Sequence, residues 1–150
     1  MFWRLLQTRN DVVPLVLRLT LGIVMFPHGA QKMLGWFGGP GFQSTITDSQ
    51  AQLGIPPFLT VLVIIAEFFG SLGLISGFLT RLSAFGIGAV MIGAIFLAHL
   101  PFGFFMNWAG DQKGEGYEYH LLAIGLALAL LIRGGGAWSL DYFLSRGKTR

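Results

Sequence analysis

Apolar positions gather into four long segments along the chain, and shorter stretches between them hold most of the charged residues. The segments run from about 12 to 34, 58 to 79, 82 to 100 and 117 to 133. A hydrocarbon core of ~30 Å takes about 20 residues of helix to cross, so each segment is close to the length of one membrane span. The pattern predicts an all-α fold, an integral membrane four-helix transmembrane bundle that forms a single membrane domain over residues 1–150.

The composition favours a membrane protein, because 53% of the residues are hydrophobic and only 11% are charged. The first apolar segment holds Arg18 and no small-residue cleavage site follows it, so we expect a span rather than a signal peptide. We expect Arg18 itself to extend toward lipid phosphates. The absence of cysteine excludes disulfide bonds, cysteine-ligated iron–sulfur clusters and a dithiol relay for this chain alone.

The basic residues predict how the spans are oriented. One side of the membrane would receive Arg4, Arg9, Arg81, Arg133, Arg146, Lys148 and Arg150. The other side would receive only Lys32 and Lys113. The positive-inside rule therefore places both termini in the cytoplasm. This asymmetry also explains the net charge of +3, so we expect the lipid bilayer as a partner and no nucleic acid.

The two longer loops would lie on the opposite side and have the sequences GWFGGPGFQSTI and LPFGFFMNWAGDQKGEG. Both are rich in glycine and aromatic residues, and we expect them to re-enter the membrane surface in part. Tyr117 and Tyr119 are expected in the interfacial belt of aromatic side chains, although either could instead donate a hydrogen bond into a cavity of the bundle. Pairs of small residues four apart, such as Gly73 and Gly77, predict close helix packing.

Ionisable side chains gather in the outer half of the predicted bundle. At 1.5 Å per residue, His28 would lie ~9 Å and Glu67 ~13 Å below the outer boundary. An isolated ionisable group at such depth costs at least ~2.5 kcal/mol, so these groups usually face inward and find partners. We predict catalytic roles for Glu67 and His28. The predicted ligand-binding residues are His28, Lys32, Glu67, Ser71, His99, Glu118 and His120.

A structural reading of the same residues stays open. Glu67 paired with Lys32 or a histidine would hold two helices together, Lys32 could extend to lipid head groups, and His28 could satisfy a carbonyl freed by Pro27. A metal site is disfavoured, because Glu118 and His120 lie two apart on a helix and point in nearly opposite directions. No E-x-x-H pair, P-loop, GxSxG or HExxH motif is present.

Several short motifs together resemble one family. HGAQKMLGWFGG after the first span, AE in the second, AHLPFGFF, GEGYEYHLL and GAWSLD are similar to the DoxX family of small four-helix bacterial membrane proteins, over about residues 18–141. The resemblance implies a bacterial plasma (inner) membrane location and a link to quinone-dependent oxidation or to redox and detoxification complexes. The family's HG-x-x-K, second-span acid and GYE segment would correspond to His28, Gly29, Lys32, Glu67 and Glu118. The closing GAWSLD would cap the last span on the cytoplasmic side.

Three functions fit these features. The first is a quinone-binding subunit of a membrane redox system, in which Glu67 relays a proton and a partner redox protein supplies electrons, so that the chain is not an enzyme alone. The second is a non-catalytic binder or transporter of a small amphiphilic molecule. The third is an assembly or scaffold subunit, which would require the polar side chains to satisfy one another. A homo-oligomer fits the small-residue helix faces.

Overall fold

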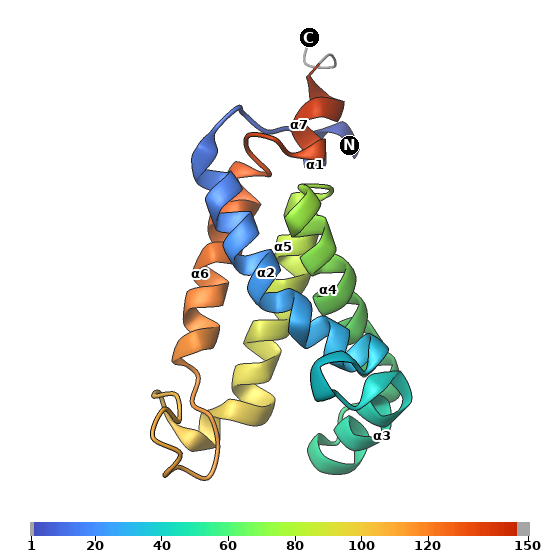
Figure 1. The fold of residues 1–150 in the computed structure, drawn as a ribbon, viewed down its shortest axis with the longest axis vertical. Coiled ribbons are helices and arrows are strands. Elements are labelled where there is room, and N and C mark those ends of the chain that lie inside the picture. Colours follow the sequence, from blue (N-terminus) through green and yellow to red (C-terminus); the bar gives the residue numbers. More distant parts are fainter. Residues whose placement is uncertain (1, 147–150) are drawn as a thin grey trace.

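The computed structural model describes residues 2–146, and the regular elements in that part of the chain are all helices. The prediction of an all-α fold is therefore confirmed. Four long helices form the body of the molecule (Figure 1). They are α2 (Val12–Leu34), α4 (Pro57–Ser76), α5 (Thr80–Ala94) and α6 (Glu118–Arg133). The shorter elements are α1 (Phe2–Leu6), α3 (Gly41–Leu53), α7 (Leu140–Ser145), the 3₁₀ helices η1 (Trp36–Gly38) and η3 (Leu100–Phe102), and the π-helical turn η2 (Ile95–His99).

The four long helices pack in the order α2, α4, α5, α6, and α6 returns to contact α2. Three stretches are long and apolar enough to cross a membrane: Val12–Leu34, Pro57–Ser76 and Thr80–Phe102, the last of which is α5 extended by η2 and η3. With 16 residues, α6 is about 24 Å long and falls short of that length. A fourth span and the orientation of the termini stay predictions. Lys148, Arg150 and the side chain of Arg4, used in the orientation argument, lie outside the described part of the chain.

Capping residues explain where the helices begin and end. Asp11 accepts the N–H of Val13 at 3.0 Å and begins α2, where Pro14 follows in the first turn. The helix continues through Pro27 and ends at Gly35, whose φ of 72° lies in the left-handed region that glycine adopts without strain. α2 therefore has the bounds of the first predicted segment.

Buried apolar side chains fill the centre of the bundle, and the outer surface is apolar as well. The core cluster contains Leu21, Met25, Leu74, Ala84, Ile87, Met91, Ala123, Ala127 and Leu130. On the outside, Phe58, Phe96 and Ile132 are 65%, 67% and 73% exposed. An apolar exterior of this extent is expected where lipid rather than water covers the protein.

The loop between α2 and α4 contains a helix that the hydropathy pattern did not predict. α3 packs against α2 and α4, and it lies with the loop before α6 at the end of the bundle opposite α1 and α7 (Figure 1). The Thr45 hydroxyl donates to Gly41 O at 2.7 Å and reaches Lys32 O at 3.5 Å. Since α3 is mostly polar, its sequence lacks the apolar run by which the other helices were recognised.

The expectation that Arg18 extends to lipid phosphates is wrong, because its side chain is only 2% exposed. The guanidinium donates hydrogen bonds to carbonyl oxygens at the end of α4 and in the turn after α6. These acceptors are Leu74, Ile75, Gly135, Ala137 and Trp138, at 2.5 to 3.4 Å. The last turn of a helix leaves carbonyls without intrahelical partners, and Arg18 satisfies them.

The closing GAWSLD motif follows α6 in the chain and binds the first residues of α5. The carboxylate of Asp141 accepts the N–H groups of Leu79 and Thr80, both at 2.8 Å, where α5 begins. The Ser139 hydroxyl accepts the N–H of Tyr142 at 3.0 Å and caps α7. The motif therefore connects α7 to the α4–α5 turn, whereas the C-cap of α6 is Gly134, which precedes the motif.

Candidate functional site

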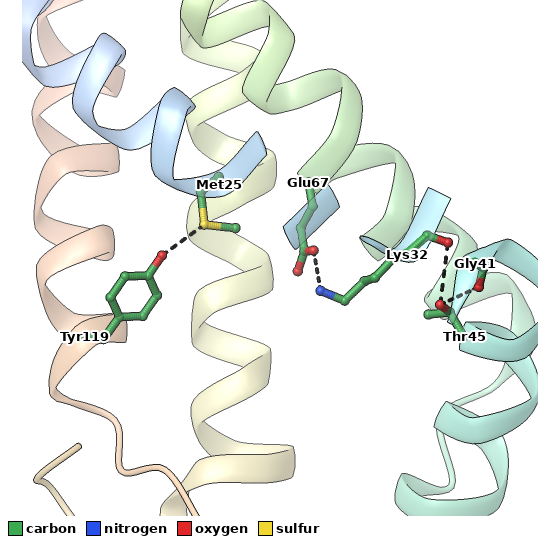
Figure 2. Close-up of polar contacts among 6 residues, drawn as sticks. All are labelled: Met25, Lys32, Gly41, Thr45, Glu67 and Tyr119. Carbon is green, nitrogen blue, oxygen red and sulfur yellow. Dashed lines mark hydrogen bonds and ion pairs between the residues drawn. The ribbon is translucent and has the colours of Figure 1, made fainter. Parts of the chain in front are cut away.

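Lys32 and Glu67 form an ion pair between α2 and α4 (Figure 2), with Nζ and Oε2 2.5 Å apart. The side chain of Glu67 is 5% exposed and that of Lys32 is 31% exposed. A carboxylate buried to this degree is costly without a cation, and Lys32 supplies one. The carbonyl of Lys32 also lies 3.5 Å from the Thr45 hydroxyl, which ties this turn of α2 to α3.

A close helix crossing places the two charged residues side by side. Gly29 lies one turn before Lys32, and a Cβ at this position would be 2.6 Å from the main-chain N and Cα of Phe68. Only glycine allows the α2 backbone to approach α4 this closely. The side chain of Glu67, the neighbour of Phe68, can therefore reach Lys32 across the crossing.

Histidine and tyrosine rings continue the polar cluster toward α6. The rings of His99 and His120 lie 4.1 Å apart between centroids, and those of His28 and Tyr119 lie 6.4 Å apart. His99 Nδ1 is 2.9 Å from the carbonyl oxygen of Glu115. His120 Nδ1 is buried and has no hydrogen-bond partner within residues 2–146. An imidazole nitrogen without a partner is costly when buried, so a ligand or water molecule that reached this atom would stabilise it.

These side chains line one large cavity of about 1230 Å³. Five of the seven predicted ligand-binding residues contribute to its wall: His28, Lys32, Glu67, His99 and His120. Away from them the wall becomes apolar and follows α4 and α5, along Leu62, Ala66 and Phe69 of α4 and Phe85, Ala89 and Gly93 of α5. A polar compartment is thus continuous with a groove between two membrane-crossing helices.

The other two predicted residues, Ser71 and Glu118, are not part of this wall. The Ser71 hydroxyl is fully buried and donates to Phe68 O of its own helix at 2.8 Å. The Glu118 carboxylate accepts the N–H of Met106 and the indole N–H of Trp108, both at 3.0 Å. Glu118 therefore organises the loop before α6, which carries other residues toward the cavity.

The cavity wall also includes Met25, Glu115 and Tyr119, which were not among the predicted ligand-binding residues. Tyr119, expected either in the interfacial belt or as a hydrogen-bond donor in the cavity, extends from α6 and donates its hydroxyl proton to the sulfur of Met25 at 3.4 Å (Figure 2). Met25 lies three residues before His28, and this spacing places both on one helix face. The spacing of Met25 and His28 was readable in the sequence, whereas the direction in which the Tyr119 side chain points depends on how α6 packs.

The donors and acceptors in the cavity suit an organic ligand with a polar end. Lys32 and Tyr119 can donate hydrogen bonds, Glu67 can accept one, and the imidazoles can do either. Within residues 2–146, no three His, Asp or Glu side chains are grouped so as to hold a metal ion. The arrangement can fix the head of a molecule and exchange a proton with it, while apolar walls receive the remainder.

Comparison with known proteins relates the chain to bacterial membrane proteins. Residues 13–100 match the model of the DoxX family. The chain is 32% identical over 137 residues to "Inner membrane protein YqjF" of Escherichia coli K12, covering 91% of this chain and 95% of that protein. It is 29% identical over 138 residues to "Putative oxidoreductase CatD" of Bacillus subtilis 168, covering 92% and 91%. No solved structure matches.

Proposed function

The chain belongs to the DoxX family, and we propose that it is the subunit of a membrane redox system that binds a quinone or a related lipophilic ligand. The predicted inner-membrane location is confirmed by a relative named as an inner membrane protein and by the three apolar helices. The redox assignment is supported by the relative whose name describes an oxidoreductase. That the ligand is a quinone or a related lipophilic molecule, and that a partner protein exchanges electrons with it, is our proposal.

The observation that carries the proposal is the continuity of the cavity. Its polar part contains the Lys32–Glu67 pair and the histidines, and its apolar part follows α4 and α5. A quinone has the matching division into a polar ring and an apolar tail. At about 1230 Å³ the cavity is larger than the ~300–1,000 Å³ of usual small-molecule sites, which suits a ligand with a long tail.

Residues of the cavity would have distinct roles. The ammonium of Lys32 would donate to a carbonyl oxygen of the ligand and increase its electron affinity, as a positive charge does beside a developing anion. Glu67, already bonded to Lys32, would take up or release the proton that accompanies electron transfer. A quinone supplies the electron-accepting ring, and a partner protein would supply the electrons because the chain lacks cysteine.

We also propose that α6 completes a four-span bundle with both termini in the cytoplasm. α6 packs against α5 and α2, and Arg9, Arg81 and Arg133 lie at the end shared by α1 and α7. The cysteine-free chain allows a direct test. An Asp111→Cys variant should react with a membrane-impermeant maleimide in intact spheroplasts, and an Arg146→Cys variant should react only after lysis. Labelling of both before lysis would contradict this orientation.

The ligand proposal is tested with purified protein and a water-soluble quinone analogue. The analogue should raise the melting temperature, and Glu67→Gln should weaken its affinity by about tenfold, since a hydrogen bond to a charged group contributes ~1.5–3 kcal/mol. Asp48→Asn removes an equal charge from the exposed side of α3 and should leave the affinity unchanged. The proposal would be contradicted if the analogue did not raise the melting temperature of the wild-type protein. It would also be contradicted if Glu67→Gln bound the analogue as tightly as wild type does.

Two other functions make different predictions. A scaffold subunit requires its polar residues to satisfy one another, and the unpartnered Nδ1 of His120 beside a large cavity argues against it. A binder without redox function would use the same cavity but would not distinguish oxidation states. Oxidised and reduced analogues that bind with equal affinity, and no loss of parent-complex turnover in Glu67→Gln, would favour the binder.

A further inference from the structure

A second cavity, of about 590 Å³, lies at the end of the molecule where α1 and α7 meet. Four arginines from four separate segments line it: Arg9, Arg81, Arg133 and Arg146. The one acidic residue of this wall is Asp11. We propose that this cavity, here called the arginine cavity, binds the phosphate of an anionic phospholipid from the adjacent leaflet.

Two of the arginines are held in place by the protein. Arg81 donates from Nη1 to the carbonyls of Leu131 and Ile132, the latter at 3.0 Å, and from Nη2 to Gln7 O at 3.3 Å. Its Nε is buried and has no partner within residues 2–146. Arg133 contacts the Asp11 carboxylate at 2.5 Å. Fixed guanidinium groups bind phosphate with little loss of side-chain entropy, and their paired N–H groups match two phosphate oxygens.

The charge of the arginine cavity is not balanced by its own residues. The Arg133 guanidinium pairs with Asp11, and Asp141, which is not part of the wall, is one further negative charge that acts on Arg81. Arg9 makes no ion pair with another described side chain. The Arg146 guanidinium lies 5.7 Å from the centres of the Tyr142 and Phe143 rings. The resulting repulsion between cations is relieved when an anion enters.

Neighbouring exposed side chains favour a lipid as the source of the phosphate. At this end of the molecule Trp138, Leu140 and Phe143 are 77%, 47% and 55% exposed. Apolar side chains beside a basic site are suited to acyl chains below a charged head group. Membrane orientation alone would require arginines on this side, but it would not require four of them to surround one cavity.

The test uses full-length protein in neutral detergent. Affinities are measured for short-chain phosphatidylglycerol, for phosphatidylcholine and for inorganic phosphate, from the rise in melting temperature with concentration. Phosphatidylglycerol should stabilise the protein most. Arg9→Gln and Arg146→Gln should each weaken its affinity about fivefold, because each removes one cation near the lipid surface. Lys113→Gln removes an equal charge from the loop before α6 and should change nothing.

The side chains of Arg9 and Arg146 are exposed and donate no hydrogen bond within residues 2–146, so both variants should melt close to the wild-type temperature before lipid is added. Unchanged phosphatidylglycerol affinity in both variants would overturn the proposal, as would equal stabilisation by phosphatidylcholine. Stabilisation by inorganic phosphate without any by phosphatidylglycerol would overturn the lipid assignment. These results do not depend on the quinone analogue. The proposals for the arginine cavity and for the larger cavity can therefore be contradicted independently.

Discussion

Replacing Gly29 by alanine tests the close crossing of α2 and α4 on which the Lys32–Glu67 pair depends. The added Cβ would lie 2.6 Å from the N and Cα of Phe68 and 2.7 Å from the carbonyl carbon of Glu67. Ordinary contacts of a Cβ begin at 3.4 Å. To reach ordinary contact the helices must therefore separate by about 0.8 Å, the difference between 3.4 and 2.6 Å, because main-chain atoms cannot rotate away as a side chain can.

The energetic cost follows from two opposing effects. Overpacking in a filled interior costs ~1–3 kcal/mol, and a contact with main chain should lie near the upper end. Alanine is a better helix former than glycine by ~1 kcal/mol, which offsets part of that cost. We expect a net loss of about 2 kcal/mol, or about 4–8 °C in melting temperature for a chain of this size.

The assay is thermal unfolding of purified variants in one detergent, with two matched glycine substitutions. A Cβ added at Gly125 of α6 would meet no neighbouring atom within 4 Å, so Gly125→Ala should melt at or above the wild-type temperature. Gly22→Ala should be intermediate, since its Cβ would meet the Ile75 side chain at 2.9 Å and Ile75 N at 3.1 Å. Gly29→Ala should also weaken the binding of the quinone analogue by displacing Lys32.

A melting temperature of Gly29→Ala equal to that of Gly125→Ala would refute the reasoning. It would mean that the α2 and α4 backbones are farther apart than the close crossing requires. Lys32 and Glu67 would then not be held within 2.5 Å of each other.

Three other predictions concern charged groups. Arg18→Met should cost about 3 kcal/mol or more in unfolding free energy, because it leaves buried carbonyls unsatisfied; unfolding in detergent measures this, and a loss below 1 kcal/mol, roughly that of a surface residue, would contradict it. A double-mutant cycle of Lys32→Met and Glu67→Gln should give a coupling energy of about 1–3 kcal/mol, whereas additive effects would show that the pair does not act as a unit. Burial raises the pKa of Asp141 above its ordinary 3.8, although backbone hydrogen bonds and Arg81 oppose the shift. Its folded pKa then exceeds the unfolded one, so its contribution to stability is present below the unfolded pKa and declines as pH rises through the folded pKa. The stability difference between wild type and Asp141→Asn should therefore fall as the pH rises above the ordinary pKa of 3.8, and a difference that rises with pH there would contradict the raised pKa.

Much of the helical framework was readable from the sequence. Residues 12–34 form α2 with the predicted bounds, because an apolar run with a capping Asp11 and a terminal Gly35 leaves few alternatives in lipid. The α3 helix escaped recognition because a mostly polar segment carries no hydropathy signal, and its helical form depends on packing against α2 and α4.

The sequence predicted that these polar residues would gather, but not which way each side chain points. The expected group included His28, Lys32 and Glu67, and all three line the cavity. Ser71 lies one turn from Glu67 yet donates to its own helix, while Tyr119 lines the cavity. The side of a helix that faces a cavity depends on its rotation against its neighbours.

The chain by itself thus determined the long apolar helices and where along them the ionisable groups lie, because both follow from the length and polarity of contiguous residues. Only the tertiary structure decided which partners those groups find. Arg18 is the plainest case: its five carbonyl acceptors come from residues 74–75 and 135–138, distant in sequence and brought together by packing. A long cation can reach water, lipid or protein carbonyls, and the choice depends on where the neighbouring helices end.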